Sequence, residues 1–155
     1  MRVTICAVGR LRAGPERDLI DDYARRFERT GRGLGLTQLT ISEVEAKKGG
    51  MAEEAQLLSK AAPAGARRIC LDERGKLMSS PDFAQTLEEW RDTGTQDAVF
   101  FIGGADGLAP ELRNQADASL SFGKMVWPHM LARVMLAEQL YRAASILAGS
   151  PYHRA

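Results

Sequence analysis

The stretch Ala98-Val99-Phe100-Phe101-Ile102 decides the fold of this chain, because all five consecutive side chains are apolar. A strand that is apolar on both faces lies inside a sheet that helices cover on both sides. The stretch runs directly into Gly103-Gly104-Ala105-Asp106-Gly107, a glycine-rich segment that ends the strand. The sequence therefore predicts a sandwiched sheet with a glycine-rich loop at one edge.

Other β-type runs and helical patterns alternate on either side of this central strand. The runs lie at 3–8, 36–41, 68–71 and 118–122, and the helical patterns at 15–29, 51–62, 81–91, 110–115 and 128–148. Such alternation predicts an α/β fold with a mostly parallel sheet. A chain of 155 residues fills one core and is too short for two ordinary domains. We therefore expect a single domain spanning residues 1–155.

The composition is that of a globular protein with balanced charge, 45% hydrophobic with a net charge of +1. A polycationic arm is excluded, but residues 1–32 hold eight arginines against five acids, so basic side chains are unevenly distributed. Cys6 and Cys70 lie in apolar runs without a neighbouring cysteine and are predicted to be core residues in a reducing compartment. No run approaches membrane-spanning length, so we expect a cytoplasmic protein without a membrane partner.

The segment Pro128–Ala148 is the best-defined helix, because Pro128 opens it and Gly149 and Pro151 end it. Its two adjacent apolar stripes exceed what covering one side of a sheet requires, which indicates a subunit interface. Glu138 and Arg142 are four residues apart in the order that favours an ion pair. This pairing is the alternative to an RNA contact for Arg142.

The glycine-rich segment after the central strand is a candidate ligand loop, because α/β folds bind ligands at the carboxyl ends of strands. No Lys-Ser/Thr pair follows it, so it is not a Walker phosphate loop. The alternative is an ordinary strand-to-helix turn capped by Asp106. Three alternating glycines within residues 31–35 follow a helix and lack the last glycine of a dinucleotide fingerprint, so that motif is rejected.

The connection Phe122–Trp127 carries Phe, Met, Val and Trp between a strand and a long helix. An apolar loop of this kind either buries an adenine ring or packs against a partner subunit, and the residues alone favour neither. His129 follows in the first turn of the helix, where capping or packing is the alternative to contact with a ligand.

The segment Ser150-Pro151-Tyr152-His153-Arg154 places an aromatic ring, an imidazole and a guanidinium in consecutive positions. Together these groups can stack on, hydrogen-bond to and neutralise a nucleotide. The alternative is a tyrosine packed on the body of the protein beside a proline that ends the helix.

Five blocks of sequence resemble one known family. They are Leu71-Asp72-Glu73-Arg74-Gly75-Lys76, Phe101 to Leu108 with its double glycine, Pro128-His129 with Ala132-Arg133-Val134, Ala137 to Ala143, and the Pro-Tyr-His-Arg segment. In order and spacing they resemble the large-subunit rRNA methyltransferase H family of the SPOUT class, the pseudouridine N3-methyltransferases. The match runs from Ala7-Val8-Gly9 to Arg154, nearly the whole chain.

The resemblance implies a trefoil knot in the C-terminal half, a homodimer formed through Pro128–Ala148, and S-adenosylmethionine as the methyl donor without a metal. The implied cofactor-binding residues are Leu71, Gly103, Gly104, Phe122, Gly123, Lys124, Met125, Val126 and Trp127. This chain departs from the family pattern at Met125-Val126-Trp127, where smaller aliphatics and Thr are common, and at Ala144, where Trp is usual.

The implied reaction moves a methyl group to N3 of a pseudouridine in 23S rRNA. We expect the assembled ribosome to be the substrate, recognised by shape, because base edges in a folded stem are hard to reach. We hypothesise that His153 acts as base or orients the uracil edge, that Arg154 stabilises developing charge or a phosphate, and that Tyr152 stacks or packs the tail. Arg133, Arg142 and His129 are candidate substrate-binding residues. Two alternatives stay open, a non-catalytic ribosome-binding or assembly factor and a SPOUT methyltransferase acting on another RNA.

Overall fold

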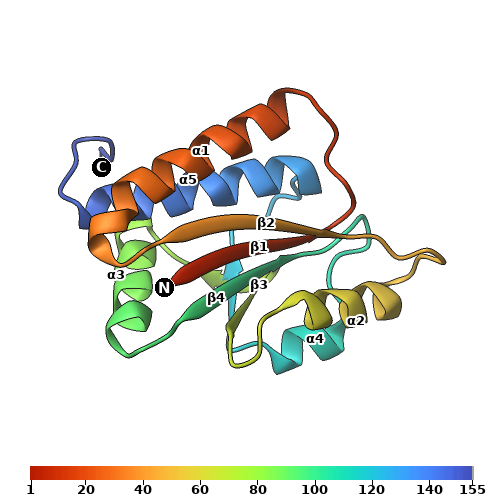
Figure 1. Cartoon of the computed structure of the whole chain (residues 1–155). Helices are drawn as coiled ribbons and strands as arrows, with labels where there is room; N and C mark the ends of the chain where they lie inside the picture. The colour runs from red at the N-terminus through yellow and green to blue at the C-terminus, as the bar shows by residue number, and fades with distance from the viewer. Residues whose placement is uncertain (155) are drawn as a thin grey trace.

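The computed structural model describes residues 1–154 and contains one sheet of five parallel strands (Figure 1). The strands are β1 (Arg2–Val8), β2 (Gln38–Val44), β3 (Arg67–Leu77), β4 (Asp97–Ile102) and β5 (Ala118–Ser121). Their order across the sheet is β2-β1-β4-β3-β5, and each neighbouring pair is parallel. The predicted α/β fold with a parallel sheet is confirmed.

Helices cover both faces of the sheet, as the apolar central strand requires. They are α1 (Pro15–Gly31), α2 (Met51–Ala61), α3 (Ser80–Asp92), α4 (Pro110–Gln115) and α5 (His129–Leu147), with a short 3-10 helix at Arg32–Leu34. Figure 1 shows α1 and α5 side by side on one face and α2 with α4 on the other.

The alternating side chains of β1 and β4 divide the core into two clusters. Phe100 and Ile102 pack with α1, α3 and α5, while Val99 and Phe101 pack with Leu58 of α2 and Leu112 of α4. Cys6 and Cys70 are fully buried in the second cluster, as predicted. β4 is the third of the five strands across the sheet, so its carboxyl end lies at the centre of the sheet edge.

Strand β3 is longer than its apolar run indicated, because it continues past Leu71 after an irregularity. The pairing of β3 with β5 shifts register between Leu71 and Lys76. A side chain at Gly75 would meet the backbone of Leu120 at 2.8 Å, so only glycine permits this close approach. Residues 72–75, which include Asp72, Glu73 and Arg74, have no pairing partner on β5.

The apolar stripes of α5 are largely used within the chain, which corrects the reason given for a subunit interface. Leu136, Leu140, Ala143 and Ala144 are almost completely buried against α1, α3 and the sheet. Apolar exposure is concentrated instead at the start of α5, where Met130 and Leu131 are 39% and 41% exposed. Ala144 therefore belongs to the core of this chain.

The C-terminal topology is consistent with a trefoil knot, since the chain passes β4 and places β5 beside β3 before α5 crosses to the other face.

None of the helices in residues 1–154 has the length and apolar character that a bilayer-spanning helix needs.

Candidate active site

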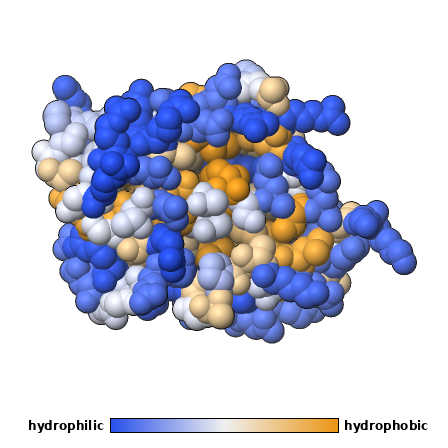
Figure 2. Space-filling view, in the orientation of Figure 1, coloured by the Kyte–Doolittle hydropathy of each residue, from blue (hydrophilic) through white to orange (hydrophobic). Residues whose placement is uncertain are grey.

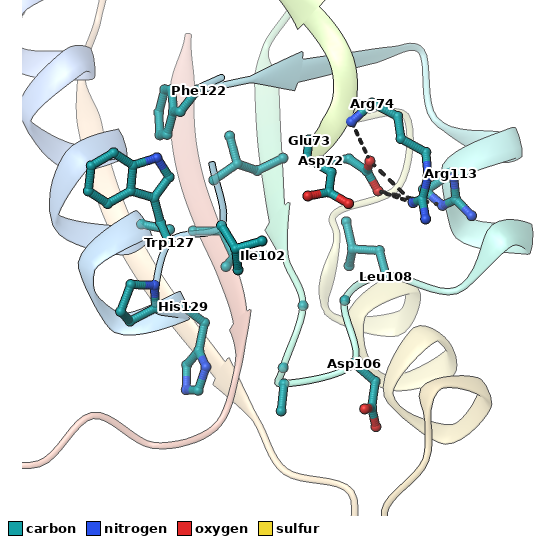
Figure 3. Close-up of a pocket in the computed structure, with 18 of the residues that line it drawn as sticks. Asp72, Glu73, Arg74, Ile102, Asp106, Leu108, Arg113, Phe122, Trp127 and His129 are labelled. Carbon is teal, nitrogen blue, oxygen red and sulfur yellow. Dashed lines mark hydrogen bonds and ion pairs between the residues drawn. The ribbon is translucent and has the colours of Figure 1, made fainter. Parts of the chain in front are cut away.

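A cleft of about 730 Å³ opens at the carboxyl edge of the sheet, between the ends of β3, β4 and β5 and the start of α5. Figure 3 shows Phe122, Trp127 and His129 on one side of it and Asp72, Glu73, Arg74 and Arg113 on the other. Its volume suits a ligand of cofactor size. Within residues 1–154 no group of three His, Cys, Asp or Glu side chains is arranged to hold a metal ion.

The floor of the cleft is the glycine-rich loop that follows β4. The N–H of Gly107 donates to the carbonyl of Gly104 at 3.0 Å, which folds the loop into a tight turn. A Cβ at Gly103 would lie 2.5 Å from the carbonyl atoms of Gly107, so this turn can close only over a residue without a side chain. At Gly103 and Gly104 the loop therefore presents backbone rather than side chains to the cleft.

One wall of the cleft is apolar and comes mainly from the loop after β5. Phe122, Gly123, Met125, Val126 and Trp127 line it, whereas Lys124 does not. The Ser121 hydroxyl accepts from the N–H of Gly123 at 3.0 Å and lies 3.1 Å from the carbonyl of Glu73, to which it donates. The serine thus fastens the start of the loop to the bulge after β3. Met125 and Val126 remain 76% and 83% exposed, so the outer part of this wall faces solvent.

The opposite wall is charged and was not predicted as part of the site. Asp72, whose side chain is only 7% exposed, accepts from the N–H of Arg74 at 2.8 Å and lies 3.6 Å from Nε of Arg113. That buried Nε has no hydrogen-bond partner in the described chain. Asp72 directly follows the predicted residue Leu71, but sequence gives no sign that α4 brings Arg113 beside it.

The structure brings most of the predicted cofactor residues together. Leu71, Gly103 and Gly104 line the same cleft as the apolar loop, and His129 lines it from the first turn of α5. Met51 at the start of α2 also lines the cleft. The partial exposure of His129 leaves it accessible to a bound molecule.

Arg133 is placed differently from the prediction, because its side chain is completely buried. Its guanidinium donates to the carbonyls of Val8 and Gly9 at 2.8 and 2.7 Å and pairs with Glu43 at 2.8 Å. A guanidinium with these partners cannot reach a nucleic acid. The predicted RNA contact of Arg133 is therefore replaced by a structural role.

The C-terminal tail packs on the middle and end of α5. The Tyr152 ring lies 4.6 Å from that of Tyr141, and its hydroxyl is 3.3 Å from the carboxylate of Glu138. Burial, reinforced by the negative charge of Glu138 and the nearby Tyr23, raises the pKa of Tyr152 to about 12. Tyr152 therefore stays protonated near neutral pH and serves as an anchor for the tail.

His153 and Arg142 meet at the same place. Nη1 of Arg142 lies 3.1 Å from Nδ1 of His153, and Arg142 also pairs with Glu138 at 2.7 Å. The hydrogen bond to Glu138 raises the pKa of Arg142. Because a guanidinium only donates, Nδ1 of His153 accepts, and Nε2 carries the proton. The predicted Glu138–Arg142 pair is confirmed and forms the base on which the tail rests.

The tail and the cleft lie at different ends of α5. Arg142, which contacts His153, follows His129 by thirteen positions, or about 20 Å along a helix. Figure 1 shows the blue segment that follows α5 at the end of this helix that is remote from the carboxyl edge of the sheet. A single chain therefore holds the predicted cofactor residues and the predicted catalytic tail apart.

A parallel sheet with a ligand-sized cleft at its carboxyl edge is the arrangement typical of α/β proteins that bind small molecules. A model of the family described as predicted SPOUT methyltransferase matches residues 1–153, and the chain belongs to this family. It is 70% identical to Ribosomal RNA large subunit methyltransferase H of Dinoroseobacter shibae and 68% identical to that of Ruegeria pomeroyi, over 99% of both chains in each case. The family resemblance noted in the sequence is confirmed.

Among solved structures, a probable methylase family protein from Haemophilus influenzae Rd KW20 shares the fold, with a TM-score of 0.50 and 14% identity. The match covers 99% of this chain and 70% of that chain.

Proposed function

We propose that this protein transfers the methyl group of S-adenosylmethionine to N3 of a pseudouridine in 23S rRNA, on the assembled ribosome. The observation that carries the proposal is the 70% identity, over nearly the full length of both chains, to a protein named as a large-subunit rRNA methyltransferase. The cleft provides the second support, because it offers a donor-sized site with an apolar and a charged wall.

The residues that line the cleft fit S-adenosylmethionine, which supplies an electrophilic methyl group when bound. Phe122, Leu71 and Ile102 offer apolar contact for an adenine ring, and the backbone at Gly103 and Gly104 offers hydrogen-bonding groups close to it. The charged wall around Asp72 suits the polar end of the molecule. As proposed, the chain binds and orients the donor at the carboxyl edge of the sheet.

A neutral imide nitrogen is a poor nucleophile, so the protein has to position the uracil and assist loss of the N3 proton. The tail carries the groups for this, with His153 and Arg154 facing the substrate and Tyr152 holding the tail on α5. While Arg142 donates to Nδ1, His153 offers an N–H at Nε2, which favours orientation of a uracil carbonyl over proton abstraction. Arg154 is exposed and free to meet a phosphate or developing negative charge.

We propose further that the protein acts as a homodimer in which the tail of one subunit completes the cleft of the other. The separation of about 20 Å along α5 supports this arrangement. So do the exposed apolar side chains at the start of α5 and the preceding loop, where Trp127 is 44% exposed.

Methyl transfer tests the activity directly. Labelled S-adenosylmethionine is incubated with intact ribosomes, large subunits and free rRNA that lack the modification, and the modified nucleoside is identified by mass. We expect label on N3 of a pseudouridine. Transfer should be fastest with intact ribosomes, because folded rRNA is recognised by its shape more readily than by its base edges, and the assembled particle presents that shape. Donor binding without transfer to these particles would favour a SPOUT enzyme for another RNA, and absence of donor binding would favour a non-catalytic ribosome factor.

Mixed dimers test the shared site. A Gly103→Ala chain, defective in the cleft, is paired with a His153→Ala chain, defective in the tail. If the tail acts across the dimer, this heterodimer contains one intact site and should recover about half of the wild-type methyl transfer rate, whereas each homodimer is inactive.

The matched control pairs a chain carrying both substitutions with a wild-type chain. A site shared between subunits leaves that heterodimer inactive, whereas a site within one chain leaves it half active. Activity in the control together with none in the first heterodimer would overturn the shared site.

A further inference from the structure

Two loops at the carboxyl edge of the sheet carry four exposed cations beside the cleft. Residues 9–14 connect β1 to α1 and include Arg10 and Arg12, and residues 45–50 connect β2 to α2 and include Lys47 and Lys48. All four side chains are exposed, and none takes part in an ion pair in the described chain. The loops contain one carboxylate, Glu45, against these four cations.

The strand order places these loops beside the cleft. In the sequence β2-β1-β4-β3-β5, the basic loops follow the first two strands, and the cleft lies at the ends of the last three. The N–H of Gly9 donates to the carbonyl of Val44 at 2.8 Å, so the two loops start side by side. Adjacent strands are about 4.8 Å apart, so the two basic loops lie one or two strand spacings from the cleft. A strand of RNA bound in the cleft would reach them within one or two nucleotides.

A buried clamp holds the first basic loop in place. Arg133 binds the carbonyls of Val8 and Gly9, and the Glu43 carboxylate with which it pairs also accepts from the N–H of Leu11 at 2.6 Å. The clamp neutralises Glu43, so this carboxylate does not offset the adjacent arginines. The loop is therefore fixed by its backbone while the side chains of Arg10 and Arg12 remain free to bind.

The space-filling view shows both hydrophilic and hydrophobic side chains at the carboxyl edge of the sheet (Figure 2). In Figure 2 long hydrophilic side chains project at the right-hand edge, where the carboxyl ends of the strands lie in Figure 1. Exposed, unpaired cations beside a cleft suit a phosphate backbone, which Lys and Arg bind without reading base sequence.

We infer that the loops 9–14 and 45–50 form an RNA-docking surface, on which Arg10, Arg12, Lys47 and Lys48 bind backbone phosphates next to the nucleotide in the cleft. The inference rests on the proposed function, since it assigns the surface that holds the rRNA. Arg133 is a positioning residue that fixes this surface from the interior.

The test measures binding to large ribosomal subunits lacking the modification, at several salt concentrations. The variants are Arg10→Ala/Arg12→Ala and Lys47→Ala/Lys48→Ala, with Lys47→Arg/Lys48→Arg as the charge-preserving form. The control is Lys60→Ala/Arg32→Ala, which removes two exposed cations away from this edge. Each alanine pair should weaken binding about tenfold or more. It should also make the fall of the log association constant with log salt concentration less steep, by about 2 in the slope.

The arginine form and the control should keep the wild-type slope, and binding of S-adenosylmethionine should be the same in all variants. Wild-type slopes in both alanine pairs, with wild-type methyl transfer, would overturn the docking surface and leave the proposed function standing. Failure of the wild-type protein itself to methylate the particles would instead refute the proposed function.

Discussion

Gly103→Ala should reduce the affinity for S-adenosylmethionine by at least about a hundredfold, because the new methyl group would displace the loop that forms the floor of the cleft. Its Cβ would lie 2.5 Å from the carbonyl carbon and oxygen of Gly107 and 2.9 Å from the N–H nitrogen of Leu108. These are backbone atoms, so relief requires the turn to open. Each tenfold loss of affinity corresponds to about 1.4 kcal/mol of binding free energy. A hundredfold loss therefore corresponds to the loss of several contacts between the loop and the bound donor.

Gly104→Ala is the matched control, since it adds the same methyl group one residue further on. There the nearest atoms are side-chain atoms, Oε2 of Glu54 at 3.2 Å and Cγ1 of Val8 at 3.3 Å, and both can move by a few tenths of an ångström. Neither glycine has a positive φ, so the two variants differ in space rather than backbone conformation. Calorimetric titration of the donor should show a loss of less than tenfold for Gly104→Ala, and equal losses would contradict this account of the loop.

Arg133→Met should lower the free energy of unfolding by about 3 kcal/mol, because it leaves the partners of a buried guanidinium unsatisfied. The carbonyl of Val8 would lose a buried donor, and Glu43 would keep its charge without a counterion. The Glu43 side chain is 28% exposed and can turn toward water, which keeps the cost at the lower end for a broken buried pair. For a chain of this length the melting temperature should fall by about 6–12 °C.

The control on the same helix is Arg142→Met, which removes a pair on a partly exposed surface. Arg142 is 24% exposed and bonds to Glu138 one turn away, so its removal should cost less than about 1 kcal/mol. Chemical denaturation of both variants measures the difference. A loss for Arg133→Met no larger than that for Arg142→Met would show that the clamp contributes little to stability.

Much of the fold could be predicted from local pattern. The apolar run of β4, the prolines that open helices and the glycine after α5 act over a few residues, so they are visible in one sequence. The extension of β3 was missed because it depends on contact between Gly75 and Leu120, which are distant in the chain. The surplus apolar face of α5 was misread for the same reason, because α1 and α3 cover it.

In the candidate site, too, the features that were predicted are local in sequence, and those that were missed depend on contacts between distant parts of the chain. The position of Gly103, Gly104 and the Phe122–Trp127 loop after recognisable strands made them candidate ligand segments, and the family resemblance implied their cofactor role. They lie in one cleft because parallel strands end at the same edge. Arg113 was missed because only the fold places it against Asp72. Arg133 was a candidate for RNA contact, and its complete burial was not predicted because charged side chains are seldom fully buried. Its guanidinium instead donates to carbonyls at the end of β1.

The length of α5 has a consequence for how the protein would behave on dilution. With the proposed sharing of the site, each subunit carries a donor cleft at one end of that helix and a substrate-facing tail toward the other end. The tail therefore does not reach the cleft of its own subunit. Dissociated subunits would still bind the donor but would turn over nothing. Specific activity should then fall with protein concentration below the dimer dissociation constant, while donor binding per chain should stay constant.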